Sequence, residues 1–356
     1  MMKDSNFNQA KAEAFSETLV ETLNRSAIAL ALSIGDRCGL FKAMANLPAS
    51  TSKQIADAAN RNERYVREWL GTMVTGRVVN YFPETQTYQL PAEHAAYLTD
   101  EGEYNFASAM QFVPVLAGVE DKLVECFEKG GGVPYTAYPR FHEVMAKESD
   151  QTTVAALEPH IIPIVPGLRE KLEAGIDVLD VGCGAGRAMI TLAKRYPNSR
   201  FAGYDFSEEV IAAANAEAAK LGLDNVRFEV RDAANIGETE AYDLITSFDA
   251  IHDQANPAGM LASIAKAIRP DGVYLVQDIT GSSYLEKNLD LPVAPWLYTI
   301  SLTHCMTVSL AYNGEGLGAM WGEERAVAMM KDAGFQNVEI NHLDHDFMNT
   351  YYVATK

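Results

Sequence analysis

Hydrophobic residues follow a helical spacing at the start of the chain. Through residues 10–47, including AIALALSIGDRCGLFKAMANL, apolar positions recur three to four apart and predict two packed helices. In the following stretch, ASTSKQIADAANRNERYVREWLGTMVTG, Ser50 or Thr51 can cap a short helix, and a second helix continues through Trp69 and Met73 after a turn. The runs VVNYF and TYQL then alternate like the strands of a hairpin. A helix-turn-helix followed by a hairpin predicts a winged helix.

The pattern changes in the second half of the chain. Residues 101–170 look mainly helical, except for EKGGGVPYTAYPRF, which is rich in Gly, Pro and Tyr. From Ile176 onward, apolar runs alternate with amphipathic helices and predict an α/β sheet, and GFQNVEINHL and NTYYVATK suit a terminal antiparallel pair of strands. We therefore expect a helical and winged-helix domain over 1–100, a helical linker over 101–174 that borders the site, and an α/β domain over 175–356.

Composition narrows the classes of partner. The 356 residues include 29 basic and 48 acidic side chains, and the formal net charge of -19 disfavours nucleic acid and anionic lipid as partners. The start of the chain lacks a signal-peptide pattern, and no run approaches the ~20 apolar residues that span a bilayer. Four cysteines lie far apart without CxxC spacing. These features predict a cytoplasmic protein with reduced thiols, no metal site and no membrane span.

The winged helix admits two interpretations, a packing or dimerisation module and a DNA reader. Between Asp36 and Asp100 there are seven basic and seven acidic residues. A DNA-reading helix normally carries a basic excess. The balanced charge disfavours nucleic acid as a partner, and the apolar N-terminal helices instead predict a homodimer.

A glycine-rich turn in IDVLDVGCGAGRAMITLAKRY indicates a nucleotide-like ligand. Gly182, Gly184 and Gly186 follow a buried strand and precede a helix, so the backbone can approach a ligand and present free N–H groups. Their spacing is GxGxG, not GxGxxG, and Asp180 stands two residues before the first glycine. A carboxylate there would crowd a pyrophosphate but can help to hold a cationic amino-acid group. The turn therefore suits S-adenosylmethionine better than NAD.

The next two strand ends agree with this ligand. RFAGYDFS ends in Asp205, which can accept hydrogen bonds from two ribose hydroxyls, and Phe206 can lie on the adenine face. VRFEVRDAANI ends in Asp232 and Ala233, where a carboxylate can accept from the adenine amino group and a backbone N–H can reach a ring nitrogen. The alternative is that Asp205 and Asp232 are solvated carboxylates at strand ends and bind no ligand.

From Ile176 to Lys356 the sequence resembles a class I S-adenosylmethionine-dependent methyltransferase. VLDVGCGAG, GYDFS, RDAANI, SFDAIHD and RPDG occur in that order at ordinary separations. With the winged helix included, the chain resembles the group that contains plant and bacterial small-molecule O-methyltransferases, most closely a bacterial branch of unassigned substrate. The resemblance implies an α/β fold with a Rossmann-like sheet, and S-adenosyl-L-methionine as the cofactor.

The resemblance also implies roles for individual residues. In this family the segment GGGVPYTAYPRF borders the pocket, which implies that Tyr138 contacts the cofactor, that Tyr135 contacts the substrate and that Phe141 lies nearby; packing at a seam is the alternative. The family carries a His-Asp at the end of the fourth strand with the histidine as general base, and His252 and Asp253 match it. The tryptophan that often follows in plant members is Gln254 here. On the same strand, Phe248 is assigned to the cofactor site.

A long apolar insert separates the fifth strand from the last helix. Residues of about 280–320 form TGSSYLEKNLDLPVAPWLYTISLTHCMTVSLAYNGEGLGAM, which suits a lid over an organic acceptor because binding pockets are mostly apolar. Trp296, His304 and, just beyond, Trp321 are the candidate substrate contacts. A helical dimer interface built from the same residues is the alternative.

These features together predict an enzyme that moves a methyl group from S-adenosylmethionine to a small acceptor (EC 2.1.1.-), most readily to an oxygen, with His252 as the base. Two alternatives stay open. One is a winged-helix transcriptional regulator that senses S-adenosylmethionine, and the other is an N- or S-methyltransferase that relies on proximity alone.

Overall fold

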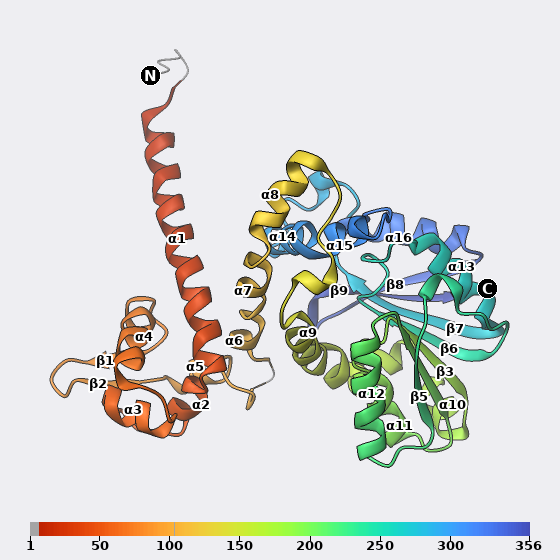
Figure 1. Ribbon diagram of the computed structural model, residues 1–356, viewed down its shortest axis with the longest axis horizontal. Coiled ribbons are helices and arrows are strands. Elements are labelled where there is room, and N and C mark those ends of the chain that lie inside the picture. Colours follow the sequence, from red (N-terminus) through yellow and green to blue (C-terminus); the bar gives the residue numbers. More distant parts are fainter. Residues whose placement is uncertain (1–6, 103) are drawn as a thin grey trace. The chain divides into compact units, whose positions relative to one another are not determined.

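The computed structural model describes residues 7–102 and 104–356, and its contacts divide the chain after Pro114 into two compact units (Figure 1). The sequence pattern places a boundary near Gly175, whereas Leu157, Ile161 and Leu168 enter the same core as Val178 of the sheet. Amphipathic spacing indicates which face of a helix is apolar but not which core that face joins. Among the described residues, no helix combines the length and the apolar character needed to cross a bilayer.

The first unit contains the predicted winged helix. Thr51 caps the third helix in a reciprocal box, in which its hydroxyl accepts from the Gln54 backbone N–H and the Gln54 side chain accepts from the Thr51 N–H. The elements are α1 (Gln9–Arg37), α2 (Leu40–Ala45), α3 (Ser52–Ala58), α4 (Glu63–Thr75), β1 (Asn80–Phe82), β2 (Thr87–Gln89), α5 (Ala92–Ala95) and α6 (Phe106–Ala109).

A tryptophan on α4 joins α1 and α2 in the core of this unit. The Trp69 indole donates to the Ala31 carbonyl at 2.8 Å, and its ring meets the edge of Phe41 at a centroid distance of 5.3 Å. Gly35 on α1 makes this contact possible, since an added Cβ would lie 2.6 Å from Phe41 and 2.7 Å from Trp69.

The second unit is built on a seven-stranded sheet in the order β5-β4-β3-β6-β7-β9-β8. The first five strands of this order are parallel, and β9 runs antiparallel to both β7 and β8, which confirms the predicted fold class and terminal pair. The strands are β3 (Asp177–Val181), β4 (Arg200–Asp205), β5 (Val226–Val230), β6 (Tyr242–Phe248), β7 (Ile268–Ile279), β8 (Asn337–Leu343) and β9 (Asp346–Thr355).

Helices cover both faces of this sheet (Figure 1). One buried core lies under α10 (Leu168–Ala174), α11 (Arg187–Arg195) and α12 (Glu208–Lys220), and the other lies under α13 (Pro257–Ala267) and α16 (Gly322–Asp332). The segment before the sheet contains α7 (Phe112–Ala117), α8 (Glu120–Lys129), the 3-10 turn η1 (Tyr135–Ala137) and α9 (Phe141–Ser149). The late insert is helical, with α14 (Ala294–Ile300), the π-helical turn η7 (Ser301–Cys305) and α15 (Met306–Ala311).

Two glycines of the first unit give opposite predictions for the same substitution. Gly35→Ala should lower the free energy of unfolding by about 1–3 kcal/mol, because its methyl group would overlap Phe41 and Trp69. Gly71→Ala, in the interior of α4 with no atom within 4 Å of the added Cβ, should raise it by roughly 0.5–1 kcal/mol through helix propensity. Urea unfolding of both variants measures the two changes, and equal effects would contradict the packing assigned to Gly35.

Candidate active site

The glycine-rich turn after β3 is shaped by three positive φ angles. Gly182, Gly184 and Gly186 have φ values of 78°, 51° and 70°. A Cβ on Gly182 would lie 2.4 Å from the Ala250 side chain, and one on Gly186 would lie 2.4 Å from the Phe228 ring. No atom lies within 4 Å of a Cβ built on Gly184. Packing therefore requires two of the glycines, while the third leaves open space in which a ligand can approach the backbone.

Asp205, at the end of β4, is fixed beside this turn. Its Oδ2 accepts from the Gly184 N–H at 3.0 Å and its Oδ1 from the Ser207 N–H at 2.9 Å. Burial raises the pKa of Asp205, and the backbone hydrogen bonds partly oppose that rise. Each carboxylate oxygen can accept more than one hydrogen bond, so both can still receive hydroxyl donors.

Asp180 lies deeper, within β3. Its Oδ1 accepts from the Thr246 hydroxyl at 2.7 Å. Burial raises the pKa of Asp180 to about 7, and the nearby Asp205 carboxylate adds to the rise. A cationic group bound close by would favour the ionised form of this acid.

The remaining cofactor candidates flank the turn at other strand ends. Asp232 follows β5, is exposed, and accepts from the Ala234 N–H at 2.9 Å, while Ala233 is buried beside it. Phe206 is 47% exposed, as expected of a ring that could cover a ligand, whereas the half-buried Phe248 packs against the sheet core.

His252 is buried and hydrogen-bonded to a carboxylate. The sequence predicts His252 at the end of the fourth strand, but β6 ends at Phe248, so His252 lies in the turn that follows. Its partner is Asp278 on β7, not the neighbouring Asp253: Nδ1 of His252 is 2.6 Å from Asp278 Oδ1. Burial lowers the pKa of His252, but Asp278 and then Cys305 outweigh it and raise this pKa well above its ordinary value.

Two further hydrogen bonds hold Asp278 in place. The Trp321 indole donates to the same Oδ1 at 3.1 Å, and the Ile279 N–H donates to it at 2.8 Å. The structure thus places Trp321, a candidate substrate contact, against the carboxylate that supports His252. Trp296 lies half-buried on α14 within the insert.

Asp253 has a different partner. The Tyr135 hydroxyl donates to Asp253 Oδ2, and burial followed by the nearby Asp253 charge raises the pKa of Tyr135 well above its ordinary value. The Tyr135 ring is also 5.6 Å from that of Phe206 between centroids. Tyr135, a predicted substrate contact, thus lies beside Phe206, a predicted cofactor contact.

An aromatic cluster surrounds His304 of the insert. The imidazole stacks on Phe141 at a centroid distance of 3.7 Å and meets the edges of Tyr135 and Tyr138 at 5.0 Å. The Tyr138 hydroxyl donates to the Thr303 carbonyl at 2.7 Å. Burial, then the charges of His252 and His142, lower the pKa of His304 to about 3, so its imidazole is neutral. Its Nε2 is buried without a hydrogen-bond partner in the described structure.

Sequence reasoning did not find Asp278, Thr246 or Cys305. A signal for Asp278 was present, since an acid ends the apolar run GVYLVQDI on the strand beside β6. Thr246 and Cys305 carry no such signal, because hydroxyls and thiols are common in apolar elements.

Two families match successive parts of the chain. Residues 26–100 match the Rv2258c-like winged HTH domain, and residues 172–316 match a methyltransferase domain. A trans-aconitate 2-methyltransferase of Acidovorax sp. (strain JS42) is 33% identical over 115 residues, which are 32% of this chain and 40% of that protein. The nocamycin O-methyltransferase of Saccharothrix syringae is 33% identical over 100 residues, 28% of this chain and 36% of that protein. The chain therefore aligns with about 40% or less of the length of these curated relatives.

Solved structures match nearly the whole chain. A putative O-methyltransferase from Nostoc punctiforme PCC 73102 superimposes with a TM-score of 0.73 and 21% identity, covering 96% of this chain and 98% of the other. Human N-acetylserotonin methyltransferase, in complex with SAM, superimposes with a TM-score of 0.71 and 17% identity, covering 99% of each chain. At these identities the likeness concerns the fold. The chain thus joins an N-terminal winged HTH domain to a methyltransferase domain that has the fold of a class I methyltransferase.

Proposed function

We propose that the protein transfers a methyl group from S-adenosylmethionine to an oxygen of a small organic acceptor, with His252 as the general base. The proposal rests on the bond between His252 Nδ1 and Asp278, which leaves Nε2 as the ring atom that can accept a proton. Bound at the glycine-rich turn, the cofactor would supply an electrophilic methyl group. Gly184 and Asp205 would hold it, because one offers open backbone and the other offers acceptors for ribose hydroxyls.

The residues around His252 have separate tasks in this scheme. Asp278 orients the imidazole and stabilises its protonated form after proton transfer, and Trp321 keeps Asp278 in place. His304 is neutral and has an unpaired, buried Nε2, which can hydrogen-bond to a polar group of the substrate. Phe141, stacked on His304, provides an apolar surface beside that substrate. The hydrogen-bonded pair of Asp253 and Tyr135 lines the part of the site that is nearest Phe206. We assign the insert of residues 280–320 to acceptor binding.

The comparisons support this proposal at the level of chemistry. The relatives named above act as methyltransferases on small molecules or are named as O-methyltransferases, and one superimposed structure contains SAM. The proposed base at His252 favours oxygen as the acceptor atom, because a hydroxyl group must lose its proton to attack the methyl group. A thiolate or a neutral amine is already nucleophilic and would not need this base.

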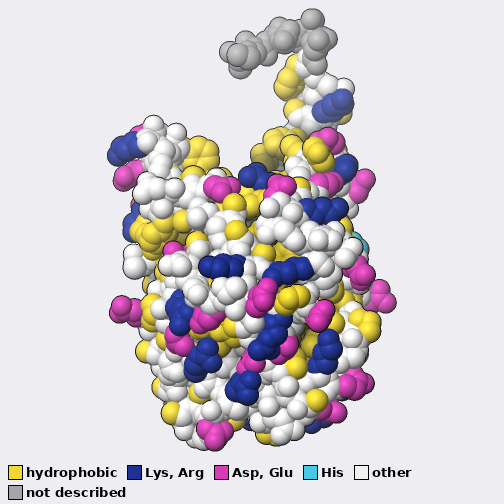
Figure 2. Space-filling model, turned by 90° about the vertical axis from the view of Figure 1, so that its right-hand side faces the viewer, with side chains coloured by type: hydrophobic (Ala, Val, Ile, Leu, Met, Phe, Trp, Pro, Cys, Tyr) yellow, Lys and Arg dark blue, Asp and Glu magenta, His cyan; other side chains and the backbone are white. Residues whose placement is uncertain are grey.

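Charge pairing on α4 disfavours the regulator alternative. Arg64 forms an ion pair with Glu68, and Arg67 forms one with Glu63. The helix that would enter a DNA groove therefore carries no excess of positive charge at these positions. Over the second unit too, on the face shown in Figure 2, acidic side chains stand among the basic ones. A gel shift at low and moderate salt would reveal DNA binding if it occurs.

Removal of the Asp205 carboxylate should weaken cofactor binding. Asp205→Ala should lower affinity for S-adenosylhomocysteine by about 1.5–3 kcal/mol in calorimetry, because two hydroxyl donors lose a charged acceptor. Glu209→Ala, which removes the same charge from the exposed first turn of α12, is the matched control and should bind like the wild type. Equal affinity of Asp205→Ala and wild type would refute the ribose assignment.

His252→Ala should lower turnover by ~10² to 10⁴ with little change in S-adenosylmethionine affinity, the usual effect of losing a general base. Turnover is measured with an acceptor found by screening hydroxylated aromatic compounds. Because Asp278 and then Cys305 raise the pKa of His252 above its ordinary value, the neutral imidazole that acts as the base forms at higher pH, and wild-type turnover should rise with pH over a range above ~6.5. Full activity of His252→Ala would leave proximity as the mechanism.

Asp278→Asn provides the companion measurement. Without the carboxylate, burial lowers the pKa of His252, so the imidazole resonances in NMR should titrate at lower pH than in the wild type. The acidic limb of the turnover profile should move to lower pH, while maximal turnover falls because the imidazole is less well oriented. An unmoved titration would contradict the pairing with Asp278.

We further propose that α1 joins two copies of the chain. Phe15, Leu19, Leu23, Leu30 and Ile34 are exposed at helical spacing, and such an apolar stripe in water favours association. Light scattering at micromolar concentration should give the mass of a dimer, and the double variant Leu19→Asp, Leu23→Asp should give that of a monomer. Asn24→Asp adds a charge to the same helix outside the stripe and should stay dimeric, so dissociation of this control would argue against the interface.

A further inference from the structure

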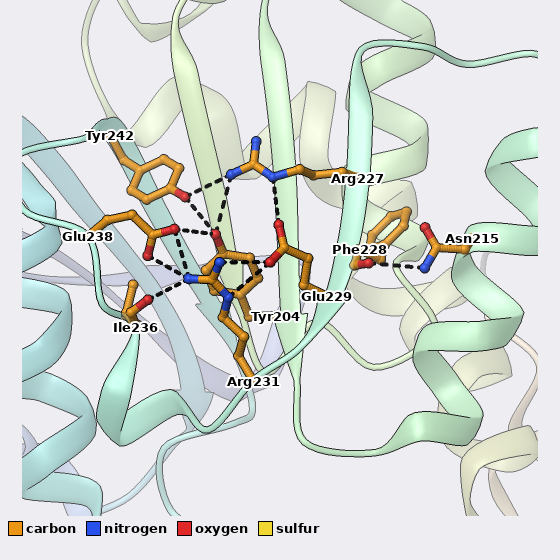
Figure 3. Close-up of polar contacts among 9 residues, drawn as sticks. All are labelled: Tyr204, Asn215, Arg227, Phe228, Glu229, Arg231, Ile236, Glu238 and Tyr242. Atoms are coloured by element: carbon orange, nitrogen blue, oxygen red, sulfur yellow. Dashed lines mark hydrogen bonds and ion pairs between the residues drawn. The ribbon is translucent and has the colours of Figure 1, made fainter.

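Arg231 spans both ends of the turn that follows β5 (Figure 3). Its Nε and Nη2 donate to Glu229 Oε2 at 3.0 and 2.7 Å, before the turn. Its Nη1 donates to the Ile236 carbonyl at 2.6 Å and to both oxygens of Glu238 at 2.8 and 2.9 Å, after the turn. One guanidinium therefore ties together two points of the chain that lie on either side of Asp232 and Ala233.

This arginine is itself anchored to the sheet. Its guanidinium carbon lies 4.4 Å from the centroid of the Tyr204 ring on β4, and the Tyr204 hydroxyl donates to Glu238 at 2.9 Å. The Arg231 backbone N–H also donates to the Asp205 carbonyl at 2.9 Å. Only 30% of the Arg231 side chain and 25% of that of Glu238 are exposed, so water competes weakly for these bonds.

The turn is also held by packing, since Ala233 and Ile236 are buried in the core under α13, but its other hydrogen bonds are mostly local. Asp232 accepts from the Ala234 N–H through its side chain and from the Asn235 N–H through its carbonyl, both at 2.9 Å. These bonds are local to the turn and do not fix its place relative to the sheet. The Ile236 N–H donates to Ser263 at 2.9 Å, which restrains the far end. The fork of Arg231 adds a link between the two ends of the turn, beside the Tyr204–Glu238 bond and the backbone bond to Asp205 that connect them to β4.

From these contacts we propose that Arg231 is a positioning residue, which holds the Asp232 carboxylate and the Ala233 N–H in place so that the site selects a 6-aminopurine. The inference rests on the proposed function and on the contacts with adenine that the sequence predicts for these two groups. The amino group of adenine donates to a carboxylate, whereas the 6-oxo group of hypoxanthine is an acceptor and repels it. Such discrimination requires the carboxylate to keep its position, since a mobile acceptor can turn away from the wrong base.

Arg227 provides a matched control within the same cluster. It lies on β5 and donates to Glu229 at 2.9 Å and to the hydroxyls of Tyr204 and Tyr242 at 3.3 Å each. None of its hydrogen bonds in the described structure reaches residues 232–238. Arg227→Gln therefore removes one charge and several bonds from the network but leaves the two ends of the turn tied together.

The experiment compares two ligands by calorimetry, S-adenosylhomocysteine and S-inosylhomocysteine, on the wild type, Arg231→Gln and Arg227→Gln. Arg231→Gln should narrow the wild-type preference for the adenine ligand by ~10-fold, as expected from misplacing one charge-assisted hydrogen bond. Arg227→Gln should keep the wild-type preference for the adenine ligand.

Amide hydrogen exchange provides a second measurement. It should become faster over residues 232–238 in Arg231→Gln but not in Arg227→Gln. If Arg231→Gln is too unstable, Arg231→Lys, which keeps the charge but loses the fork, should show the same changes.

The outcomes separate this inference from the proposed function. A wild type that binds neither ligand contradicts the proposed cofactor and this inference together. A wild type that prefers the adenine ligand, with the same preference in Arg231→Gln, overturns the role of Arg231 alone. Equal losses in Arg231→Gln and Arg227→Gln also overturn it, because they would reflect the whole charge network and not the link across the turn.

Discussion

The parallel pairing of β3 with β4 on one side and with β6 on the other is the constraint that builds the site. Its register sets Val181 opposite Tyr204 and Asp180 opposite Thr246, so the three strands end together at one edge. The Gly182 and Cys183 N–H groups donate to the Tyr204 carbonyl at 2.8 and 3.1 Å, which locks the glycine-rich turn onto β4. Because crossover helices carry the chain back after each strand, the successive turns can only meet at this edge.

A consequence of this convergence is a high density of buried ionisable groups. Burial, together with the Asp278 charge, raises the pKa of Asp249 to about 8, and burial also raises the pKa of Asp253. The Asp278 carboxylate, and then Cys305, raise the pKa of His252 although burial lowers it. The environment that makes this imidazole a stronger base also delays its deprotonation to higher pH.

The aromatic side of the site is fixed by contacts between distant parts of the second unit. The Val133 N–H donates to the Thr307 hydroxyl at 3.0 Å, and Tyr138 bonds to Thr303. A Cβ on Gly132 would lie 1.9 Å from the Thr307 carbonyl, so only glycine permits this approach. These contacts bring Tyr135 and Phe141 against His304, and they form a mostly apolar wall with one unpaired nitrogen, a surface that suits an organic acceptor with a polar group.

The sequence by itself determined the elements and the edge at which they meet. Period and capping located the winged helix, the strands and the glycine-rich turn, because these signals lie within a few consecutive residues. It also placed Asp205 and Asp232 at strand ends, since the carboxyl ends of parallel strands share one edge.

Tertiary structure decided which side chains meet. Asp253 follows His252 in the chain, but the imidazole bonds to Asp278 on the next strand, and Asp253 accepts from the Tyr135 hydroxyl. The helices before Gly175 join the sheet core, although their apolar pattern would equally suit a separate linker. Hydrogen bonds between side chains depend on distances of a few tenths of an ångström and on the register of neighbouring strands, and neither is encoded in the spacing of residues along the chain.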